Sequence, residues 1–137
     1  PGETPKPLTD IASGGEISRI MLSIKTVFQS NDPVDTLIFD EIDSGISGET
    51  AEKVAIALAK LAKVKQVICI SHLPQIASRA NHHLHVTKSI KKNQTKVELQ
   101  YLNKKERISV LSNLYGSVKM SGKMKESYQS VINTAHG

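Results

Sequence analysis

The chain has 137 residues, of which 39% are hydrophobic and 23% charged, and these fractions are those of an ordinary folded domain, not of a disordered segment. Eighteen Lys and Arg residues against 13 Asp and Glu give a net charge of +5, which permits contact with nucleic acid or nucleotide but also describes many solvated surfaces. No apolar run has bilayer length, no secretory leader opens the chain, and the single Cys69 lies in an apolar run, so we expect a cytoplasmic protein with no membrane partner.

Residues 1–10 predict an extended lead-in. Three prolines within the first eight residues disfavour a regular helix there. The chain also has no initiator Met, and we therefore expect it to be a piece of a longer polypeptide.

Residues 13–28 combine a helix start with a pair of glycines. Apolar residues recur at helical spacing and predict an amphipathic helix: Ile17, Ile20, Met21, Ile24 and Phe28. The polar residues fall mainly on its other faces: Ser18, Arg19 and Lys25. Ser13 with Glu16 makes a capping-box pattern, which needs no function. The cap does not explain Gly14 and Gly15, each of which costs up to about 1 kcal/mol relative to Ala in a helix. Their uncovered N–H groups, with the Ser13 hydroxyl, favour phosphate binding at the positive end of the helix.

Residues 36–43 join an apolar strand to a group of carboxylates. The run at 36–39 is rich in β-forming residues and predicts a buried strand. Asp40, Glu41 and Asp43 follow it directly, and carboxylates this close raise one another's pKa unless a cation lies among them. The pattern fits a Walker-B strand, in which Asp40 holds Mg²⁺ and Glu41 polarises the water that attacks a γ-phosphate. A plain strand followed by an acidic turn fits it as well.

A helix and a second strand follow. The flexible turn at 44–48 precedes a helix that begins at Glu49. Its apolar residues share one face: Ala51, Val54, Ala55, Leu58, Leu61 and Ala62. Residues 66–70 then form a continuous apolar strand, of the kind that is buried on both faces of a parallel sheet.

The order strand, helix, strand predicts where the polar residues meet. A right-handed crossover brings Asp40 and Ser71 to the same end of the sheet. His72 then lies beside the carboxylate edge, one strand from Glu41, which favours a role at a phosphate over that of an ordinary loop residue. A short helix is predicted at 74–79, because proline suits the first turn.

Beyond residue 80 the pattern becomes alternating. Residues 84–87 and 95–101 flank the polar turn 91–94 and predict an antiparallel hairpin. Three histidines of this region invite a metal hypothesis: His82, His83 and His85. It is disfavoured, because no Cys or acidic residue lies at ligand spacing and one strand supplies only two ligands.

Two more helices are predicted by apolar spacing, at 108–115 and 124–132. The lysines at 119, 123 and 125 between them are typical of a solvated loop. A nucleotide site needs a P-loop, and the nearest stretch, residues 116–124, has one residue too many between its glycines and Met124 where a Mg²⁺-binding hydroxyl belongs. The sequence therefore offers catalytic acids and a phosphate-facing glycine pair without the loop that cradles the phosphates.

The order and spacing of these motifs resemble those of ABC-type ATPases. Residues 13–16 resemble the signature motif, 36–41 the Walker B strand, 42–45 the D-loop, and His72 the switch histidine. The chain is most similar to the RecN family, SMC-like ATPases of bacterial DNA double-strand-break repair. That resemblance is carried by four stretches: 5–8, 11–22, 39–48 and 72–77.

The resemblance to RecN is uneven along the chain. It is strong from about Pro5 to Ala80, looser to Arg107 and weak in the last helix. Ser44 and Ser71 stand where many relatives carry Thr, and both keep a hydroxyl. The Lys-rich tail departs further, which leaves its role open.

The resemblance implies a fold and a division of labour. The chain would be the C-terminal lobe of an ABC-type ATPase head, an α/β fold with a mainly parallel sheet flanked by helices and a C-terminal hairpin. Residues 1–10 would follow a coiled coil, and residues 11–137 would complete a head whose N-terminal part carries the P-loop. The chain would then be inactive alone.

The resemblance also implies a role for each site residue. Two heads would form a homodimer around two ATP molecules, with the signature of one head against nucleotide held by the other: Ser13, Gly14, Gly15 and Glu16. Asp40 would serve Mg²⁺, Glu41 would be the catalytic base, His72 would sense the γ-phosphate and Asp43 would link the two sites. Hydrolysis would open the dimer and couple ATP to the binding or tethering of DNA at the bacterial nucleoid.

Two other functions fit the sequence. One is the head of a different SMC-like ATPase, of chromosome condensation or recombination, although the residues after His72 argue against it. The other is a non-enzymatic DNA-binding or assembly module, in which the acidic edge merely caps a strand. A harmless Asp40→Ala in the intact protein would favour that module.

Overall fold

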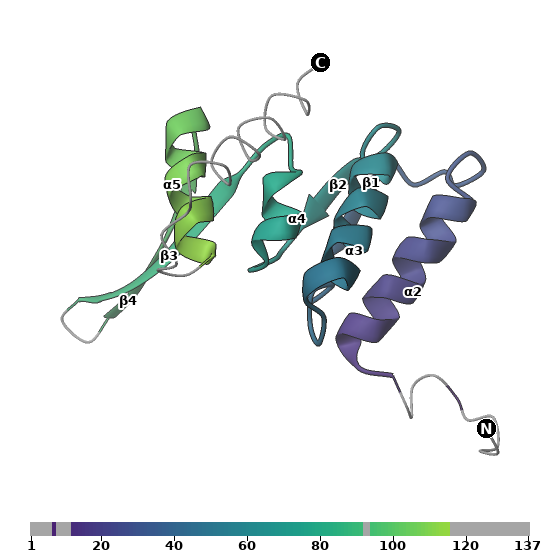
Figure 1. Cartoon of the computed structure of the whole chain (residues 1–137), viewed down its shortest axis with the longest axis horizontal. Coiled ribbons are helices and arrows are strands. Elements are labelled where there is room, and N and C mark those ends of the chain that lie inside the picture. Colours follow the sequence, from purple (N-terminus) through teal and green to yellow (C-terminus); the bar gives the residue numbers. More distant parts are fainter. Residues whose placement is uncertain (1–6, 8–11, 92–93, 116–137) are drawn as a thin grey trace. The chain divides into compact units, whose positions relative to one another are not determined.

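A computed structural model describes residue 7, residues 12–91 and residues 94–115 (Figure 1). Most of the expected lead-in, the last predicted helix, the lysines at 119, 123 and 125 and the 116–124 stretch lie outside these residues. The elements in chain order are α2 (Gly14–Val27), β1 (Thr36–Phe39), α3 (Gly48–Leu61), β2 (Gln66–Cys69), α4 (Pro74–Ser78), β3 (Leu84–Lys91), β4 (Gln94–Tyr101) and α5 (Lys104–Leu114). The chain divides into two compact units, Pro1–Ile76 and Ala77–Gly137.

The first unit is built on a parallel pair of strands. β1 pairs with β2 from Thr36 opposite Gln66 to Phe39 opposite Cys69, and α3 lies between them in the chain. The parallel pairing confirms that Asp40 and Ser71, the residues after the two strands, lie at the same end of the sheet. α2 packs beside α3, as Figure 1 shows.

The core of this unit lies between the helices and one face of the strands. Its buried residues come from α2, β1, the turn after β1, α3 and α4: Leu22, Leu37, Phe39, Ile42, Val54, Ala55, Leu58, Leu61 and Ile76. The apolar face predicted for α3 is buried as expected, apart from Ala62 just after the helix.

The prediction that the second strand is buried on both faces is wrong for this chain. Leu37 and Phe39 of β1 are buried, whereas Ile38 between them is 67% exposed. On β2 and just beyond it, Ile68 and Ile70 are 45% and 57% exposed. An apolar run indicates that its side chains are suited to burial, but it does not indicate which segment covers them.

The apolar face of α2 is likewise uncovered. The five residues that define it are between 37% and 61% exposed, whereas Gly15 and Leu22 are the buried residues of the helix. The face that packs within the chain is therefore the one that carries Gly15, Ser18, Arg19 and Leu22, at helical positions i, i+3, i+4 and i+7. Periodicity located the helix but not the face that the chain covers.

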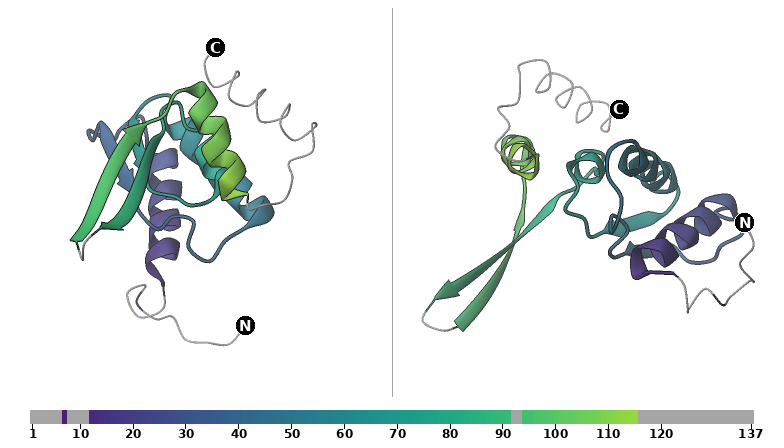
Figure 2. Two further views of the ribbon diagram at one scale, coloured as in Figure 1. Left: turned by 90° about the vertical axis from the view of Figure 1, so that its left-hand side faces the viewer. Right: turned by 60° about the horizontal axis from the view of Figure 1, so that its bottom comes forward.

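The second unit contains the predicted hairpin. β3 and β4 are antiparallel, from Leu84 opposite Tyr101 to Lys91 opposite Gln94, so the strands are longer than the alternation at 84–87 predicted. Figure 2 shows them as a twisted ribbon with α5 beside it. One face of this ribbon is apolar and exposed: Leu84, Val86, Ile90, Val97, Leu99 and Tyr101. Within the described part of the chain, no helix is both long and apolar enough to span a bilayer.

α5 is tied to the segment before the hairpin. Asn103 caps the helix and forms a capping box with Glu106, so the helix begins four residues earlier than the apolar spacing at 108–115 indicated. The buried guanidinium of Arg107 donates to the carbonyl oxygens of Ala80 and Asn81, at 2.5 and 3.2 Å. These bonds fix the entry to the hairpin.

Candidate functional site

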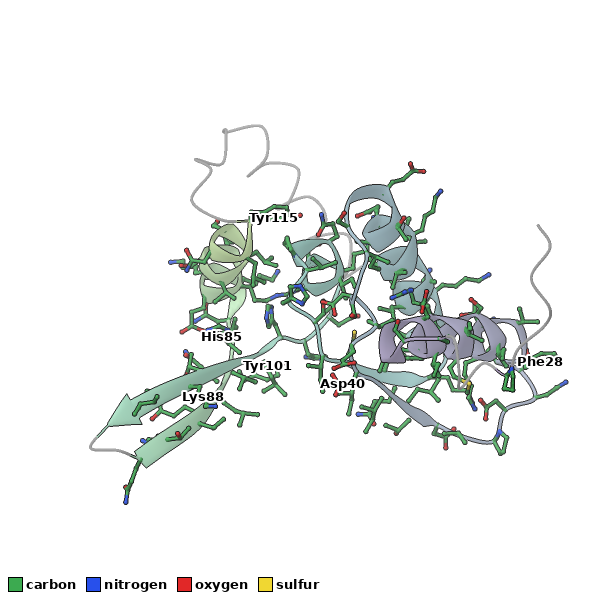
Figure 3. The ribbon with its side chains drawn as sticks, turned by 90° about the horizontal axis from the view of Figure 1, so that it is seen from below. Phe28, Asp40, His85, Lys88, Tyr101 and Tyr115 are labelled. Atoms are coloured by element: carbon green, nitrogen blue, oxygen red, sulfur yellow. The ribbon has the colours of Figure 1, made fainter. Side chains whose placement is uncertain are left out.

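Asp40 and Glu41 are exposed to solvent and directly follow β1. Both are exposed, and Figure 3 places Asp40 beside the start of α2, with Phe28 at the other end of that helix. One carboxylate oxygen of Asp40 accepts the N–H of Glu41 at 2.9 Å. The expected position of these two acids at the carboxyl end of the strand is therefore confirmed.

Glu41 has an unusual backbone conformation. Its φ of 54° makes it the one non-glycine residue with positive φ among the residues that the structure describes. The left-handed region costs such a residue roughly 1–2 kcal/mol. The N–H of Ser44 donates to the Glu41 carbonyl oxygen at 2.9 Å and closes a tight turn around it. The backbone of Glu41 therefore carries local strain where the chain turns out of β1.

Asp43 does not join the other two carboxylates. Its side chain is 4% exposed and turns inward to the segment after β2. Its Oδ2 atom accepts from the Ser71 hydroxyl at 2.7 Å, from the His72 N–H at 2.8 Å and from the Leu73 N–H at 3.3 Å. Of the three acids that follow β1, Asp40 and Glu41 are therefore exposed, whereas Asp43 is an acceptor for the segment after β2.

These contacts keep Asp43 charged. Burial alone would raise the pKa of this carboxyl group, but the hydrogen bonds from Ser71 and His72 outweigh it, and the pKa lies below its ordinary value. A buried carboxylate with this many donors fixes the positions of the groups that bind it.

His72 is held by the same carboxylate. Its Nδ1 atom lies 2.9 Å from Oδ2 of Asp43, while its side chain is 76% exposed. A carboxylate at Nδ1 favours the ring form with a proton there, which leaves Nε2 for a partner outside. The structure thus brings His72 and Asp43 together and orients the imidazole from within the chain.

The start of α2 is already capped. The Ser13 N–H and hydroxyl both donate to one oxygen of Glu16, at 2.8 and 2.9 Å, and the Glu16 N–H donates back to Ser13 at 3.4 Å. The hydrogen bond from the Ser13 backbone is the main cause of the lowered pKa of Glu16. The capping box is therefore present, and its own carboxylate supplies a negative charge at the helix end.

The two glycines of α2 have different neighbours. A Cβ atom on Gly15 would lie 2.8 Å from both the Glu41 carbonyl oxygen and the Ser44 Cβ atom. A Cβ atom on Gly14 would meet only the tip of the Glu41 side chain, at 2.9 Å. Gly15 is thus required for close packing of α2 on the loop, a reason for a glycine that the sequence did not disclose.

Two polar residues of α2 complete this contact and were not singled out from the sequence. The Ser18 hydroxyl donates to the Asp40 carbonyl oxygen at 2.9 Å. One nitrogen of Arg19 donates to the carbonyl oxygens of Ile42 and Ser44, at 3.1 and 2.8 Å. The available signal was their spacing, three and four residues after Gly15.

Asp40 is the residue of this site that suits a magnesium ion. Mg²⁺ is commonly bound by one or two carboxylates together with water and substrate phosphates, and an exposed carboxylate fits that role. Among the described residues, no three or more His, Cys, Asp or Glu side chains are grouped to hold a metal by themselves.

Three further residues noted in the sequence are Cys69, His82 and His83. Burial raises the pKa of the Cys69 thiol to about 11, so it is protonated at neutral pH and a poor nucleophile. His82 contacts the ring of Tyr101 in the hairpin unit. His83 is half-buried, and burial lowers its pKa.

Known proteins resemble the chain along nearly its whole length. It is 39% identical over 135 residues to the DNA repair protein RecN of Halalkalibacterium halodurans, covering 98% of this chain and 24% of the relative. Identity is 37% over 134 residues to RecN of Bacillus subtilis, covering 98% and 23%, and 59% over 87 residues to RecN of Treponema pallidum, covering 64% and 15%. The chain spans about a quarter of the length of the first two relatives. No family model matches it.

A solved structure resembles the fold. The similar chain comes from a study of ATP-driven dimerization and DNA-stimulated activation of SMC ATPases, with a TM-score of 0.55 and 22% sequence identity. The match covers 85% of the present chain and 69% of that one. The α/β fold expected from the sequence, with parallel strands flanked by helices and a later antiparallel hairpin, is confirmed.

Proposed function

From the premise that this chain is a RecN-like segment with the fold of an SMC ATPase head, we propose that it forms the C-terminal part of a head that binds and hydrolyses ATP. The observation that carries the proposal is the pair of exposed carboxylates beyond β1, Asp40 and Glu41, at the same sheet end as an oriented His72. Parallel sheets bind phosphate ligands at this end.

Each group has a chemical role in that reaction. Asp40 would hold Mg²⁺, which neutralises charge on the β- and γ-phosphates when it is bound. Glu41 would accept a proton from the attacking water. His72 would contact the γ-phosphate through Nε2, and as the imidazolium it would donate from Nε2 to the phosphate and from Nδ1 to Asp43. Asp43 would act by orienting His72, because its carboxylate is buried against the segment that carries the histidine.

The phosphate-binding loop would come from the N-terminal part of the same protein. Two uncovered apolar surfaces of the first unit support such a partner, namely the outward face of α2 and the outward isoleucines of the strands. The exposed apolar face of the hairpin supports it in the second unit. Surfaces of this kind commonly mark places where another part of a protein packs.

A second head would complete the site. Ser13, Gly14, Gly15 and Glu16 would contact ATP held by the partner head, in a homodimer that closes on ATP and opens after hydrolysis. The N-terminal position of these residues on α2 supports the contact, because N–H groups and the helix dipole favour phosphate there. The cycle would couple ATP to DNA binding or end tethering during recombinational repair at the bacterial nucleoid.

Glu41→Gln in the full-length protein tests the proposal. The amide cannot accept the proton, so we expect ATP binding to persist while hydrolysis falls by roughly 100-fold or more and the dimer is trapped. The control is Glu49→Gln, which neutralises an exposed glutamate on α3 that pairs with Lys53. Hydrolysis at the wild-type rate in Glu41→Gln would show that this residue is not the base.

A further inference from the structure

Polar residues of α2 donate hydrogen bonds to the backbone of the catalytic loop, residues 40–44. Ser18 donates to the carbonyl oxygen of Asp40, and Arg19 donates to those of Ile42 and Ser44, at distances between 2.8 and 3.1 Å. Gly15 lies against the Glu41 carbonyl oxygen, where a side chain would not fit. The helix thereby contacts the backbone of the whole turn that carries Glu41 and Asp43.

Arg19 occupies the central place in this contact. A single nitrogen of its guanidinium bridges the carbonyl oxygens on either side of Asp43. Within the same turn Glu41 has positive φ, and a residue in that region persists only where its surroundings fix it. The bridge binds the turn from α2, while the Asp43 side chain in the same turn accepts hydrogen bonds from Ser71 and His72.

We propose that Arg19 is a positioning residue for hydrolysis, which fixes Glu41 and the Asp43–His72 pair by clamping the carbonyl oxygens of Ile42 and Ser44; this role rests on the proposed function of Glu41. Arg19 contacts backbone atoms of the loop and not the reacting groups. It also stands outside the buried apolar cluster of the first unit, so its removal leaves that cluster intact.

Steady-state kinetics of the full-length protein test this role. Arg19→Gln should lower kcat by between about 10-fold and 100-fold, because a small displacement of a catalytic group is costly, while KM for ATP stays within about twofold. Arg19→Lys should recover part of kcat, since an ammonium keeps the charge and donors but has a shorter reach. The matched control is Lys53→Gln, which removes an exposed cation of α3 that pairs with Glu49 and should leave kcat unchanged.

Ser18→Ala is a second test, for the case in which Arg19→Gln destabilises the fold. It removes the bond to Asp40 and leaves a small residue in place, so we expect a several-fold fall in kcat with an unchanged thermal midpoint. A wild-type kcat in Arg19→Gln would overturn the positioning role. If Arg19→Gln has a lowered midpoint, a wild-type kcat in Ser18→Ala overturns it. Unchanged hydrolysis in Glu41→Gln would instead overturn the proposed function itself, so the two failures are distinct.

Discussion

The two faces of α2 differ in what they contact. One face, formed by Gly15, Ser18, Arg19 and Leu22, packs on the loop after β1 and on the core. The other is apolar and lies open to solvent: Ile17, Ile20, Met21, Ile24, Val27 and Phe28. Small and polar residues thus meet the loop after β1, whereas large apolar ones point away from the chain's own core.

This difference indicates two separate tasks for one helix. Backbone carbonyl groups of a tight turn need donors, so a serine, an arginine and a glycine suit the inward face. A continuous apolar surface is costly in water, so it is suited to contact with another part of the longer protein. The helix would then transmit contact between that part and the catalytic loop.

The largest effect is expected on the apolar face. Met21→Glu should cost roughly 3–5 kcal/mol in the full-length protein if this face is covered there, because an unpaired charge would be buried. Ser23→Glu, at an exposed position on the border between the two faces of the same helix, should cost less than about 0.5 kcal/mol. Calorimetry of the two variants distinguishes the cases. Equal thermal midpoints would show that the apolar face remains in water.

A smaller loss of stability is expected when the buried acceptor Asp43 is changed. Asp43→Asn replaces a buried acceptor oxygen by an amide and should cost about 1–3 kcal/mol at neutral pH. The pKa of Asp43 is lowered in the folded protein, so its contribution to stability is present above the unfolded value of about 4 and is lost as the pH falls through the folded pKa.

The thermal midpoint of Asp43→Asn should accordingly fall less steeply than that of the wild type when the pH is lowered below about 4. Unfolding curves over this range measure the difference. Parallel pH profiles for the two proteins would contradict the role of Asp43 as a charged acceptor.

The smallest effect on stability is expected at Gly15, on the face of α2 that packs on the loop after β1. Gly15→Ala places a methyl group 2.8 Å from the Glu41 carbonyl oxygen, and we expect a net loss of about 1 kcal/mol after the gain in helix propensity. Gly14→Ala meets only a flexible side-chain tip and should be neutral or slightly stabilising. Urea unfolding of the pair is the measurement. A Gly15→Ala protein as stable as Gly14→Ala would show that the helix does not pack closely on the loop.

From the sequence, the positions of the helices and strands in the first unit were predicted better than the burial of their faces. Strand and helix positions followed from apolar spacing and capping residues, and the parallel pairing placed Asp40 and Ser71 correctly. The exposure of Ile38 and of the α2 face was not predictable, because a spacing pattern carries no information on which segment covers it.

The candidate site was predictable in part for a similar reason. Asp40, Glu41 and His72 follow strand ends, where topology alone brings them to one edge. The inward turn of Asp43 depends on donors 28 to 30 residues away in the chain, and the contacts of Ser18 and Arg19 span 22 to 25 residues. Such side-chain contacts need the packed structure to be seen.

Subunit mixing most directly tests whether the acids and the glycine-lined helix end serve different nucleotides. Full-length Glu41→Gln and Ser13→Arg proteins, each inactive alone, would be mixed in equal amounts and allowed to exchange subunits before ATP hydrolysis is measured. We expect roughly a quarter of the wild-type rate, because half of the dimers would be mixed and each of these would hold one intact site. A mixture as inactive as its components would contradict the account, since it would place Ser13 and Glu41 of one chain at the same ATP.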